Sequence, residues 1–228
     1  MKKKIKIFIF ARKNSKGVKN KNLIKVNSKP LIYYSIKVAK QIVSKNDIYI
    51  SSDNVKLEKI AKLYGVNFIK RPKKLATSNS PEFLSWKHAI NIIKNKKIHF
   101  DIFVSLPTTS PLRNKNDVLK TIKKLNKNSD IILTANKSVR SPYFNIVEKN
   151  YTGFYNTIIK KKIFRRQDAP LTFDLNTVAF VTTPKYISES NSIFDGNVSI
   201  NQIPVERSLD IDTKFDLEIA KIKMKNEK

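Results

Sequence analysis

The chain of 228 residues contains no cysteine, which excludes disulfide bonds, thiolate metal sites and a cysteine nucleophile. Histidine is nearly absent: the two histidines, His88 and His99, do not form the HExxH pattern of a zinc hydrolase, and a histidine-rich zinc site is not expected. Four glycines occur, at positions 17, 65, 153 and 196. Their spacing allows neither a Walker A loop nor a GxGxxG fingerprint, so the two commonest nucleotide-binding motifs are excluded.

Acidic residues are scarce: 18 Asp and Glu stand against 46 Lys and Arg, and the net charge is +28. Such an excess favours an anionic partner, and a nucleic-acid-binding basic protein is one interpretation. However, the lysines are spread along the whole chain, and no RRM, OB or helix-turn-helix pattern is present. Compositional drift explains the charge more simply, and we expect no specific nucleic-acid partner.

Long hydrophobic runs are also missing. The apolar run near the N-terminus is short and contains Lys6, which is too little for a transmembrane helix and weak for a signal peptide. We therefore expect no membrane partner and a cytoplasmic location.

Apolar residues instead follow alternating strand and helix periods, which predicts βαβ units, a mostly parallel sheet and an α/β, Rossmann-like fold. Residues 138–175 break this pattern with aromatic residues and a basic cluster, and they predict an antiparallel β insertion in a single domain spanning 1–228. The predicted strands are 5–10, 47–52, 66–69, 101–106, 131–134, 178–182 and 197–205, and the predicted helices are 30–43, 55–64, 80–94, 116–125 and 212–224.

A basic loop, Ala11 to Asn22, follows the first predicted strand directly. The carboxyl edge of a parallel sheet is where α/β proteins bind ligands, so this loop is well placed for binding. It carries five cations, the hydroxyl of Ser15, and Gly17, which lets backbone approach a ligand; this chemistry suits a triphosphate. The cations are Arg12, Lys13, Lys16, Lys19 and Lys21. The alternative is a solvated basic loop, which any lysine-rich protein can contain.

Near the C-terminus, Asp210 and Asp212 flank a single apolar residue. In a strand, both carboxylates would face the same side. Paired carboxylates beside phosphates are typical ligands of Mg²⁺, a hard cation that prefers oxygen. We therefore predict Mg²⁺ as a cofactor at this pair. The alternative is that Asp212 only caps the helix that follows.

Six short blocks connect these features. They are the loop at 11–22, ISSD at 50–53 with a Tyr-Gly turn at 64–65, RPKKLA at 71–76, TSPLR at 109–113, RQ at 166–167 and SLDIDT at 208–213. In kind and order they resemble the acylneuraminate cytidylyltransferase (CMP-sialic acid synthetase) family over about residues 5–222. The resemblance implies a three-layer nucleotidyltransferase fold and a homodimer in which 138–175 is the β-rich dimerisation arm.

The resemblance also implies a reaction, in which CTP is joined to a 2-keto-3-deoxy sugar acid of the nonulosonic type and pyrophosphate is released. Arg12 and Lys21 would be catalytic clamps on the triphosphate, and Asp210 and Asp212 would be catalytic metal ligands. The implied nucleotide-binding residues are Arg12, Ser15, Lys16, Gly17, Lys21, Asn22, Arg71, Ala76 and Ser80. The implied residues for the acceptor are Thr109, Ser110, Arg166, Gln167 and Asn176.

Four places depart from the family pattern. Pro107 stands where members specific for sialic acid carry glutamine, and Glu82 replaces a small residue of the turn on the base side. The family's Asn-Gly-Ala motif is Asn-Thr-Val-Ala at 176–179, with Thr177 in place of glycine, and Asp174 lies near the place where some members carry a sugar-binding arginine. The acceptor half is therefore the less well matched, and we expect a nonulosonate other than N-acetylneuraminate to be preferred.

Two rival interpretations remain within this fold class. A 3-deoxy-manno-octulosonate cytidylyltransferase is the nearest, although the pair Lys16-Gly17 favours the sialate branch. A paralogue that binds nucleotide without turnover is the other, and the retention of Asp210 and Asp212 argues against it.

Overall fold

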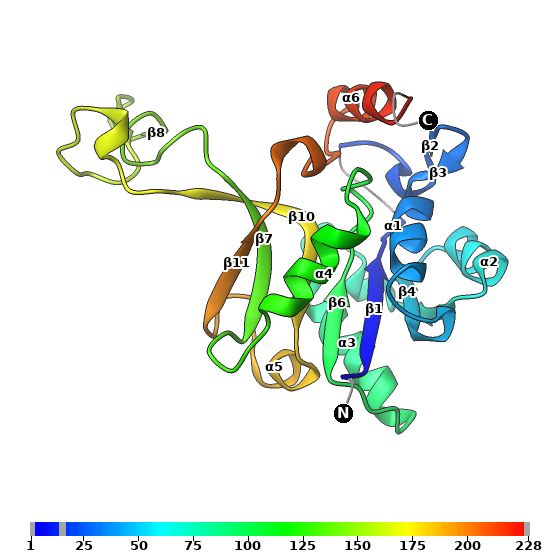
Figure 1. The fold of residues 1–228 in the computed structure, drawn as a ribbon. Helices are drawn as coiled ribbons and strands as arrows, with labels where there is room; N and C mark the ends of the chain where they lie inside the picture. The colour runs from blue at the N-terminus through cyan, green and yellow to red at the C-terminus, as the bar shows by residue number, and fades with distance from the viewer. Residues whose placement is uncertain (1–2, 14–16, 226–228) are drawn as a thin grey trace.

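The computed structural model describes residues 3–13 and 17–225. Its centre is a seven-stranded sheet with the order β11-β7-β10-β6-β1-β4-β5 (Figure 1). The strands are β1 (Ile5–Phe10), β4 (Ile48–Ser52), β5 (Asn67–Lys70), β6 (Ile102–Ser105), β7 (Ile131–Lys137), β10 (Phe173–Thr182) and β11 (Val198–Gln202). Each lies on a strand predicted from the apolar pattern.

The sheet is mostly parallel, as predicted. Strand β1 pairs in parallel with β4 and β6, and parallel pairs also join β4 to β5 and β7 to β11. Strand β10 is the exception, because it runs antiparallel to both β6 and β7. It brings the chain back from the arm that β7 enters, so it must run in the opposite direction to β7.

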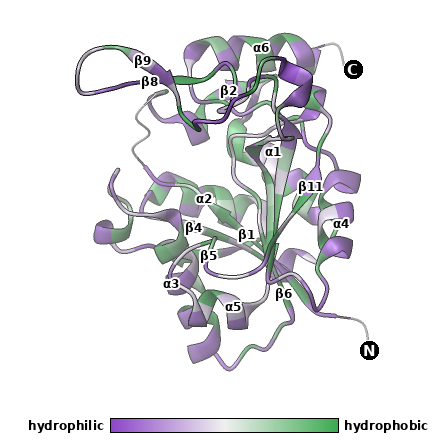
Figure 2. Cartoon of the chain, turned by 90° about the vertical axis from the view of Figure 1, so that its left-hand side faces the viewer, coloured by the Kyte–Doolittle hydropathy of each residue, from purple (hydrophilic) through white to green (hydrophobic). Residues whose placement is uncertain are grey.

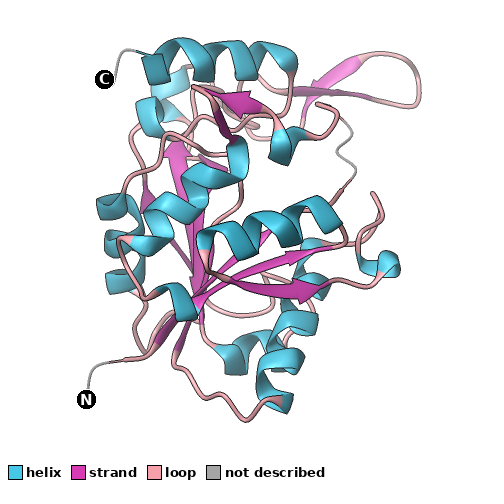
Figure 3. Cartoon of the chain, turned by 90° about the vertical axis from the view of Figure 1, so that its right-hand side faces the viewer, coloured by secondary structure: helices cyan, strands magenta, loops and turns pink. Residues whose placement is uncertain are grey.

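The alternation of side chains along β1 divides the core into two layers. Ile7 and Ile9 pack into a cluster with residues of α1 (Leu31–Lys40), α2 (Val55–Tyr64) and α4 (Lys115–Lys124). Phe8 and Phe10 point to the other face and pack with α3 (Glu82–Asn95) and α5 (Pro184–Glu189). Helices therefore cover both faces of the sheet (Figure 3), which confirms the three-layer α/β fold.

Local sequence explains several helix ends. The side chain of Asn54 caps α2, and Gly65 ends it at a positive φ of 64°. Asn114 and Asp117 form a capping box at the start of α4. Helix α5 was not predicted, although Thr183 caps it and a proline opens it. Its six residues are too few to show a helical period.

Helix α6 (Lys214–Lys225) lies beyond the carboxyl edge of the sheet. Its Leu217 and Ala220 pack against Val18 of the loop after β1, against Val26 and against Ile211. Val26 belongs to a short hairpin of β2 (Lys25–Val26) and β3 (Lys29–Pro30). This third cluster fixes the basic loop and the segment that carries Asp210 and Asp212 beside each other. Several predicted boundaries were wrong. Strand β10 begins at 173 rather than 178, inside the segment predicted as the arm, and β7 ends at 137 rather than 134. Helix α1 ends at 40 rather than 43, α6 begins at 214 rather than 212, and β11 ends at 202 rather than 205.

The chain between β7 and β10 leaves the sheet as an arm (Figures 1 and 2). It contains an antiparallel ribbon of β8 (Val147–Lys149) and β9 (Tyr155–Thr157), as the sequence predicted. Large apolar side chains are exposed along it, among them Tyr151, Phe154 and Phe164. Within the described ranges, no helix combines the length and apolarity needed to cross a bilayer.

Candidate active site

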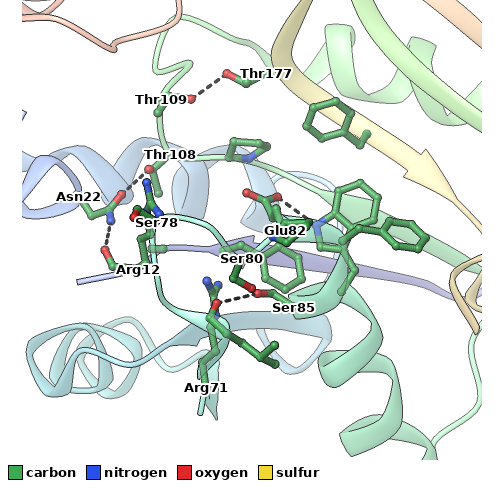
Figure 4. Close-up of a pocket in the computed structure, with 18 of the residues that line it drawn as sticks. Arg12, Asn22, Arg71, Ser78, Ser80, Glu82, Ser85, Thr108, Thr109 and Thr177 are labelled. Carbon is green, nitrogen blue, oxygen red and sulfur yellow. Dashed lines mark hydrogen bonds between the residues drawn. The ribbon is translucent and has the colours of Figure 1, made fainter. Parts of the chain in front are cut away.

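A pocket of about 800 Å³ opens where β1 and β6 end (Figure 4). Its walls come from the loop after β1, the turn before α3, the loop after β6, strand β10 and the segment around Ile211. Nine of the residues predicted for the site line it: Arg12, Gly17, Lys21, Asn22, Arg71, Ser80, Thr109, Asp210 and Asp212. The fold therefore brings the basic loop, the base-side turn and the paired carboxylates to one place. Ser15 and Lys16 lie outside the described residues.

The basic loop contacts the carboxylate segment directly. Lys21 Nζ donates to Asp212 Oδ1 at 2.9 Å and to the Ile211 carbonyl at 2.5 Å. Gly17 is closer still, because a Cβ built on it would lie 2.0 Å from the Asp212 carbonyl oxygen. Any larger residue at 17 would force the two segments apart. Glycine is therefore required at position 17 for the contact between these two segments, in addition to the predicted approach of backbone to a ligand.

The carboxylates of Asp210 and Asp212 both reach the pocket, as predicted, but not from a strand. Their segment is irregular and is held by the Ile211 N–H, which donates to the Thr109 carbonyl at 2.9 Å. Ile211 is fully buried between them. Asp210 Oδ1 is shielded from solvent and has no hydrogen-bond partner among the residues that the structure describes, whereas the Asp212 side chain is 74% exposed.

The alternative role of Asp212 as a helix cap is wrong. Thr213 Oγ1 accepts a hydrogen bond from the Asp216 N–H at 3.2 Å, and the Asp216 carboxylate accepts one from the Thr213 N–H at 2.7 Å. These two residues cap α6 reciprocally, and the Asp212 carboxylate instead pairs with Lys21.

A divalent cation fits the pair of carboxylates as a partial ligand set. Hard cations prefer carboxylate oxygens, and the shielded Asp210 Oδ1 lacks a partner in the described chain. Residues 3–13 and 17–225 hold no cluster of three or more His, Cys, Asp or Glu side chains suited to a metal. Phosphate oxygens and water would therefore have to complete the coordination.

One wall of the pocket contains Arg71 and the turn before α3, where the sequence predicts that the nucleotide base binds; we call it the base-side wall. Arg71 lies at its centre and is 6% exposed. Its Nη2 donates to the Ser51 carbonyl at 2.8 Å, and its guanidinium lies 5.5 Å from the centre of the Phe10 ring. Burial lowers the pKa of Arg71, and the nearby charge of Glu82 opposes that shift. Arg12 Nη1 donates to the Thr77 carbonyl at 3.0 Å and so fixes the turn before α3. Ala76 belongs to this turn but does not line the pocket.

Asn22 lines the pocket and connects the loops that follow the two central strands, β1 and β6. Its Nδ2 donates to the Arg12 carbonyl at 2.9 Å, and its Oδ1 accepts from Thr108 Oγ1 at 2.5 Å. The side chain is 7% exposed. Its amide therefore holds the loops after β1 and β6 at a fixed separation.

The residues predicted for the acceptor are divided. Thr109 Oγ1 and Ser110 Oγ each lie 2.7 Å from Thr177 Oγ1, but Ser110 is buried behind the pocket wall. Asn176 is also buried, and its Nδ2 donates to Asn136 Oδ1 at 2.7 Å. It does not line the pocket.

Arg166 and Gln167 lie on the arm. They line a separate cavity of about 410 Å³ between the two connections of the arm to the sheet. Within one chain, therefore, they do not join the other predicted acceptor residues.

Three further residues belong to the site, although no role in it was predicted for them. Thr177 links the two hydroxyls described above and lines the pocket. Arg113 is buried, and it donates to the carbonyls of Pro107 and Thr177. Burial lowers its pKa to about 9, against the opposing charges of Asp210 and Asp117. The sequence did contain signals for these residues. Arg113 is the last residue of the TSPLR block, and Thr177 and Glu82 are positions where the chain departs from the family pattern.

Glu82 is the third of these residues. It is exposed to the open pocket, yet the pocket walls surround it, and this enclosure raises the pKa of its carboxyl. A hydrogen bond from Trp86 Nε1 to its Oε1, at 3.0 Å, and the charges of Arg71 and Arg12 oppose the shift.

The fold is the three-layer α/β fold of known nucleotidyltransferases, with the pocket at the carboxyl edge of its sheet. A solved CMP:2-keto-3-deoxy-manno-octonic acid synthetase, complexed with CTP, aligns with a TM-score of 0.71 over 99% of this chain and 100% of that chain. A 4-diphosphocytidyl-2C-methyl-D-erythritol synthase from Anaerococcus prevotii aligns with a TM-score of 0.67 over 98% and 99%. Sequence identities are 15% and 14%, so these likenesses concern the fold.

The family model described as cytidylyltransferase matches residues 7–215. The chain therefore belongs to the cytidylyltransferase family, and it is a nucleotidyltransferase.

Curated relatives of similar length support this assignment. The CMP-N,N'-diacetyllegionaminic acid synthase of Campylobacter jejuni is 33% identical over 96% of this chain and 94% of its own. The post-translational flagellin modification protein B of Campylobacter coli is 31% identical with the same coverage. A pseudaminic acid cytidylyltransferase of C. jejuni is 30% identical over 93% and 92%.

Proposed function

We propose that this enzyme transfers CMP from CTP to a nonulosonic, sialic-acid-like sugar acid and releases pyrophosphate. The observation that carries the proposal is the meeting of the basic loop and the paired carboxylates in one pocket at the carboxyl edge of the sheet. The relatives' names support the acceptor class, because they include legionaminic, pseudaminic and N-acylneuraminic acid transferases. Since CTP is an intracellular metabolite, we expect the reaction to run in the cytoplasm.

In this proposal the loop after β1 binds the triphosphate. Arg12 and Lys21 supply positive charge, and Ser15, Lys16 and Gly17 complete the phosphate-binding segment. The anomeric hydroxyl oxygen forms a bond to the α-phosphorus while the bond from that phosphorus to the β-bridging oxygen breaks. The hydroxyl proton leaves to solvent, and pyrophosphate carries away the negative charge that the two cations neutralise. Catalysis is therefore mainly positioning and charge stabilisation.

Asp210 and Asp212 would hold Mg²⁺ together with substrate oxygens. A bound divalent cation neutralises charge on phosphate oxygens and orients the reacting groups. The pairing of Lys21 with Asp212 keeps one carboxylate beside the phosphate-binding loop. Arg113 is buried close enough to Asp210 for the two opposite charges to attract each other, and this attraction opposes the lowering of the Arg113 pKa by burial.

The nucleoside would lie against the base-side wall, with Arg71, Ser80 and the turn containing Ala76 around the base and Asn22 near the ribose. Three polar side chains of this wall already have fixed geometry, because Arg71 and Asn22 are buried and hydrogen-bonded and Arg12 donates to the Thr77 carbonyl. Because these side chains are already ordered, little conformational entropy is lost when the nucleotide binds.

The acceptor would bind beside Thr109, and Ser110 and Asn176 would support that wall from behind. Arg166 and Gln167 cannot complete this subsite in their own chain, since they line a separate cavity on the arm. We therefore infer a homodimer in which the arm packs on a second copy and brings Arg166 of the partner subunit toward the acceptor carboxylate. The exposed apolar side chains of the arm support this arrangement.

A panel of sugar acids tests the proposed acceptor class. Pro107 lines the pocket and has no side-chain donor, so it cannot bind a sugar hydroxyl as glutamine would. A lost polar partner changes discrimination by about tenfold to a hundredfold. We expect kcat/KM, measured by pyrophosphate release with CTP and Mg²⁺, to be highest for a deaminated or diamino nonulosonate.

If N-acetylneuraminate were best by tenfold, the inference from Pro107 would be wrong. If 3-deoxy-manno-octulosonate were best, the acceptor class itself would be wrong.

A further inference from the structure

Glu82 is a third acidic residue in the pocket, beside the paired Asp210 and Asp212 and the basic Arg12, Lys21 and Arg71. It is the first residue of α3, and its Oε1 accepts a hydrogen bond from Trp86 Nε1 at 3.0 Å. Trp86 is 2% exposed and is packed against Phe10, Phe83 and Phe103. The carboxyl group is therefore held in one orientation by a closely packed aromatic neighbour. Figure 4 shows Glu82 among the side chains that line the pocket.

The second carboxyl oxygen of Glu82 is available to a ligand. Among the residues that the structure describes, no Lys, Arg or His lies within 4.0 Å of it. A carboxylate beside a triphosphate subsite would repel the phosphates, so it needs a donor from another part of the ligand. The charges that act on it most strongly are those of Arg71 and then Arg12, which belong to the base-side wall.

We propose that Glu82 accepts a hydrogen bond from the exocyclic amine of cytosine and thereby selects CTP over UTP. This inference rests on the proposed nucleotide side of the pocket and deepens it. Cytosine carries an amine at the ring position where uracil carries a carbonyl oxygen. A carboxylate facing that carbonyl would bring two acceptors together without a hydrogen, which disfavours uracil by about tenfold to a hundredfold. Glu82 follows the 76–80 turn after a single residue, Pro81, which places it at the edge of the base-side wall.

The variant Glu82→Gln separates base reading from packing. Glutamine keeps an oxygen for the Trp86 N–H, but its amide can also present N–H to the uracil carbonyl. Glu82→Ala removes both groups. Glu218→Gln is the matched control, because Glu218 is exposed on α6.

The measurement is calorimetric binding of CMP and UMP, which needs no acceptor and no turnover, with kcat/KM for CTP and UTP as a second readout. We expect the native enzyme and Glu218→Gln to prefer CMP by tenfold or more. Glu82→Gln should reduce that preference at least fivefold, and Glu82→Ala should weaken CMP more than UMP.

An unchanged CMP to UMP ratio in Glu82→Gln would overturn the proposal. If the KM for the sugar acid rose instead, Glu82 would face the acceptor; if nothing but thermal stability changed, it would serve only α3. A native enzyme that bound CMP selectively but transferred it to no sugar acid would leave this inference standing and refute the proposed acceptor.

Discussion

At the residue scale, the carboxylate of Asp212 is not needed to cap α6, so we assign it a role in binding a ligand rather than in stabilising the fold. Thr213 and Asp216 cap α6 without it, so Asp212→Asn should leave the melting temperature almost unchanged. The same variant should lose roughly a thousandfold in kcat, about 4 kcal/mol of transition-state stabilisation, because a metal ligand is removed.

The control for this prediction is Asp216→Asn. It weakens a helix cap and should cost about 1 kcal/mol of stability while leaving kcat within a fewfold of native. Near-normal turnover of Asp212→Asn at saturating Mg²⁺ would contradict the assigned role.

Glu82 gives a second prediction at this scale, in the dependence of stability on pH. Enclosure raises its pKa in the folded state above the ordinary value of 4.5. The folded protein therefore binds more protons than the unfolded chain between 4.5 and the raised pKa, and stability falls as the pH rises through that window. Glu82→Gln removes this loss.

We therefore expect Glu82→Gln to melt at a higher temperature than the native protein at pH 8, with the difference closing below pH 4. Scanning calorimetry over this range measures it. A variant that is less stable at pH 8 would mean that the ionised carboxylate stabilises the start of α3.

At the scale of elements, one ion pair positions the carboxylate segment. Arg207 donates two hydrogen bonds to Asp117, each 2.9 Å long, and so joins the chain just before Asp210 to the start of α4. The Asp117 side chain is 4% exposed and would be left without its cationic partner in Arg207→Met. Its capping interactions with Asn114 would remain.

We expect Arg207→Met to lower the free energy of unfolding by about 1–3 kcal/mol, measured by urea denaturation. Because the segment is also released, kcat should fall more than the affinity for CMP. Retention of native kcat would show that Ile211 and Thr109 suffice to hold the carboxylates.

The same scale shows what sequence patterns can supply. Apolar periodicity predicts the strands and most helices, because a buried strand or an amphipathic helix records its own environment in its sequence. The direction of β10 follows from the return path of the arm, which is not a local property. Likewise, Lys21 and Asp212 are 191 residues apart, so a motif can place each at the sheet edge but cannot show that they pair.

At the scale of the whole molecule, the arm leads us to predict that two copies of the chain associate. The arm extends away from the sheet (Figure 1), and its aromatic side chains are exposed. Isolated apolar surfaces of this kind are usually covered by a partner. We expect the protein to sediment as a dimer. The double variant Phe154→Ser with Phe164→Ser should shift it toward monomer and raise the KM for the sugar acid, with little change in CMP binding.

Phe215→Ser is the matched control, since Phe215 is exposed on α6 away from the arm. It should remain dimeric. If the native protein were monomeric at micromolar concentration, the proposal that the arm of one copy completes the acceptor site of another would be wrong.

The central claim is that one pocket joins CTP to a nonulosonic acid. Phosphorus NMR of a mixture of enzyme, CTP, Mg²⁺ and sugar acid tests this claim most directly. The account predicts that the three CTP resonances are replaced by one phosphodiester signal of a CMP-sugar and by pyrophosphate, in equal amounts and only when the sugar acid is present. Conversion of CTP to CMP or CDP irrespective of the sugar acid, or no conversion with any nonulosonate, would contradict it.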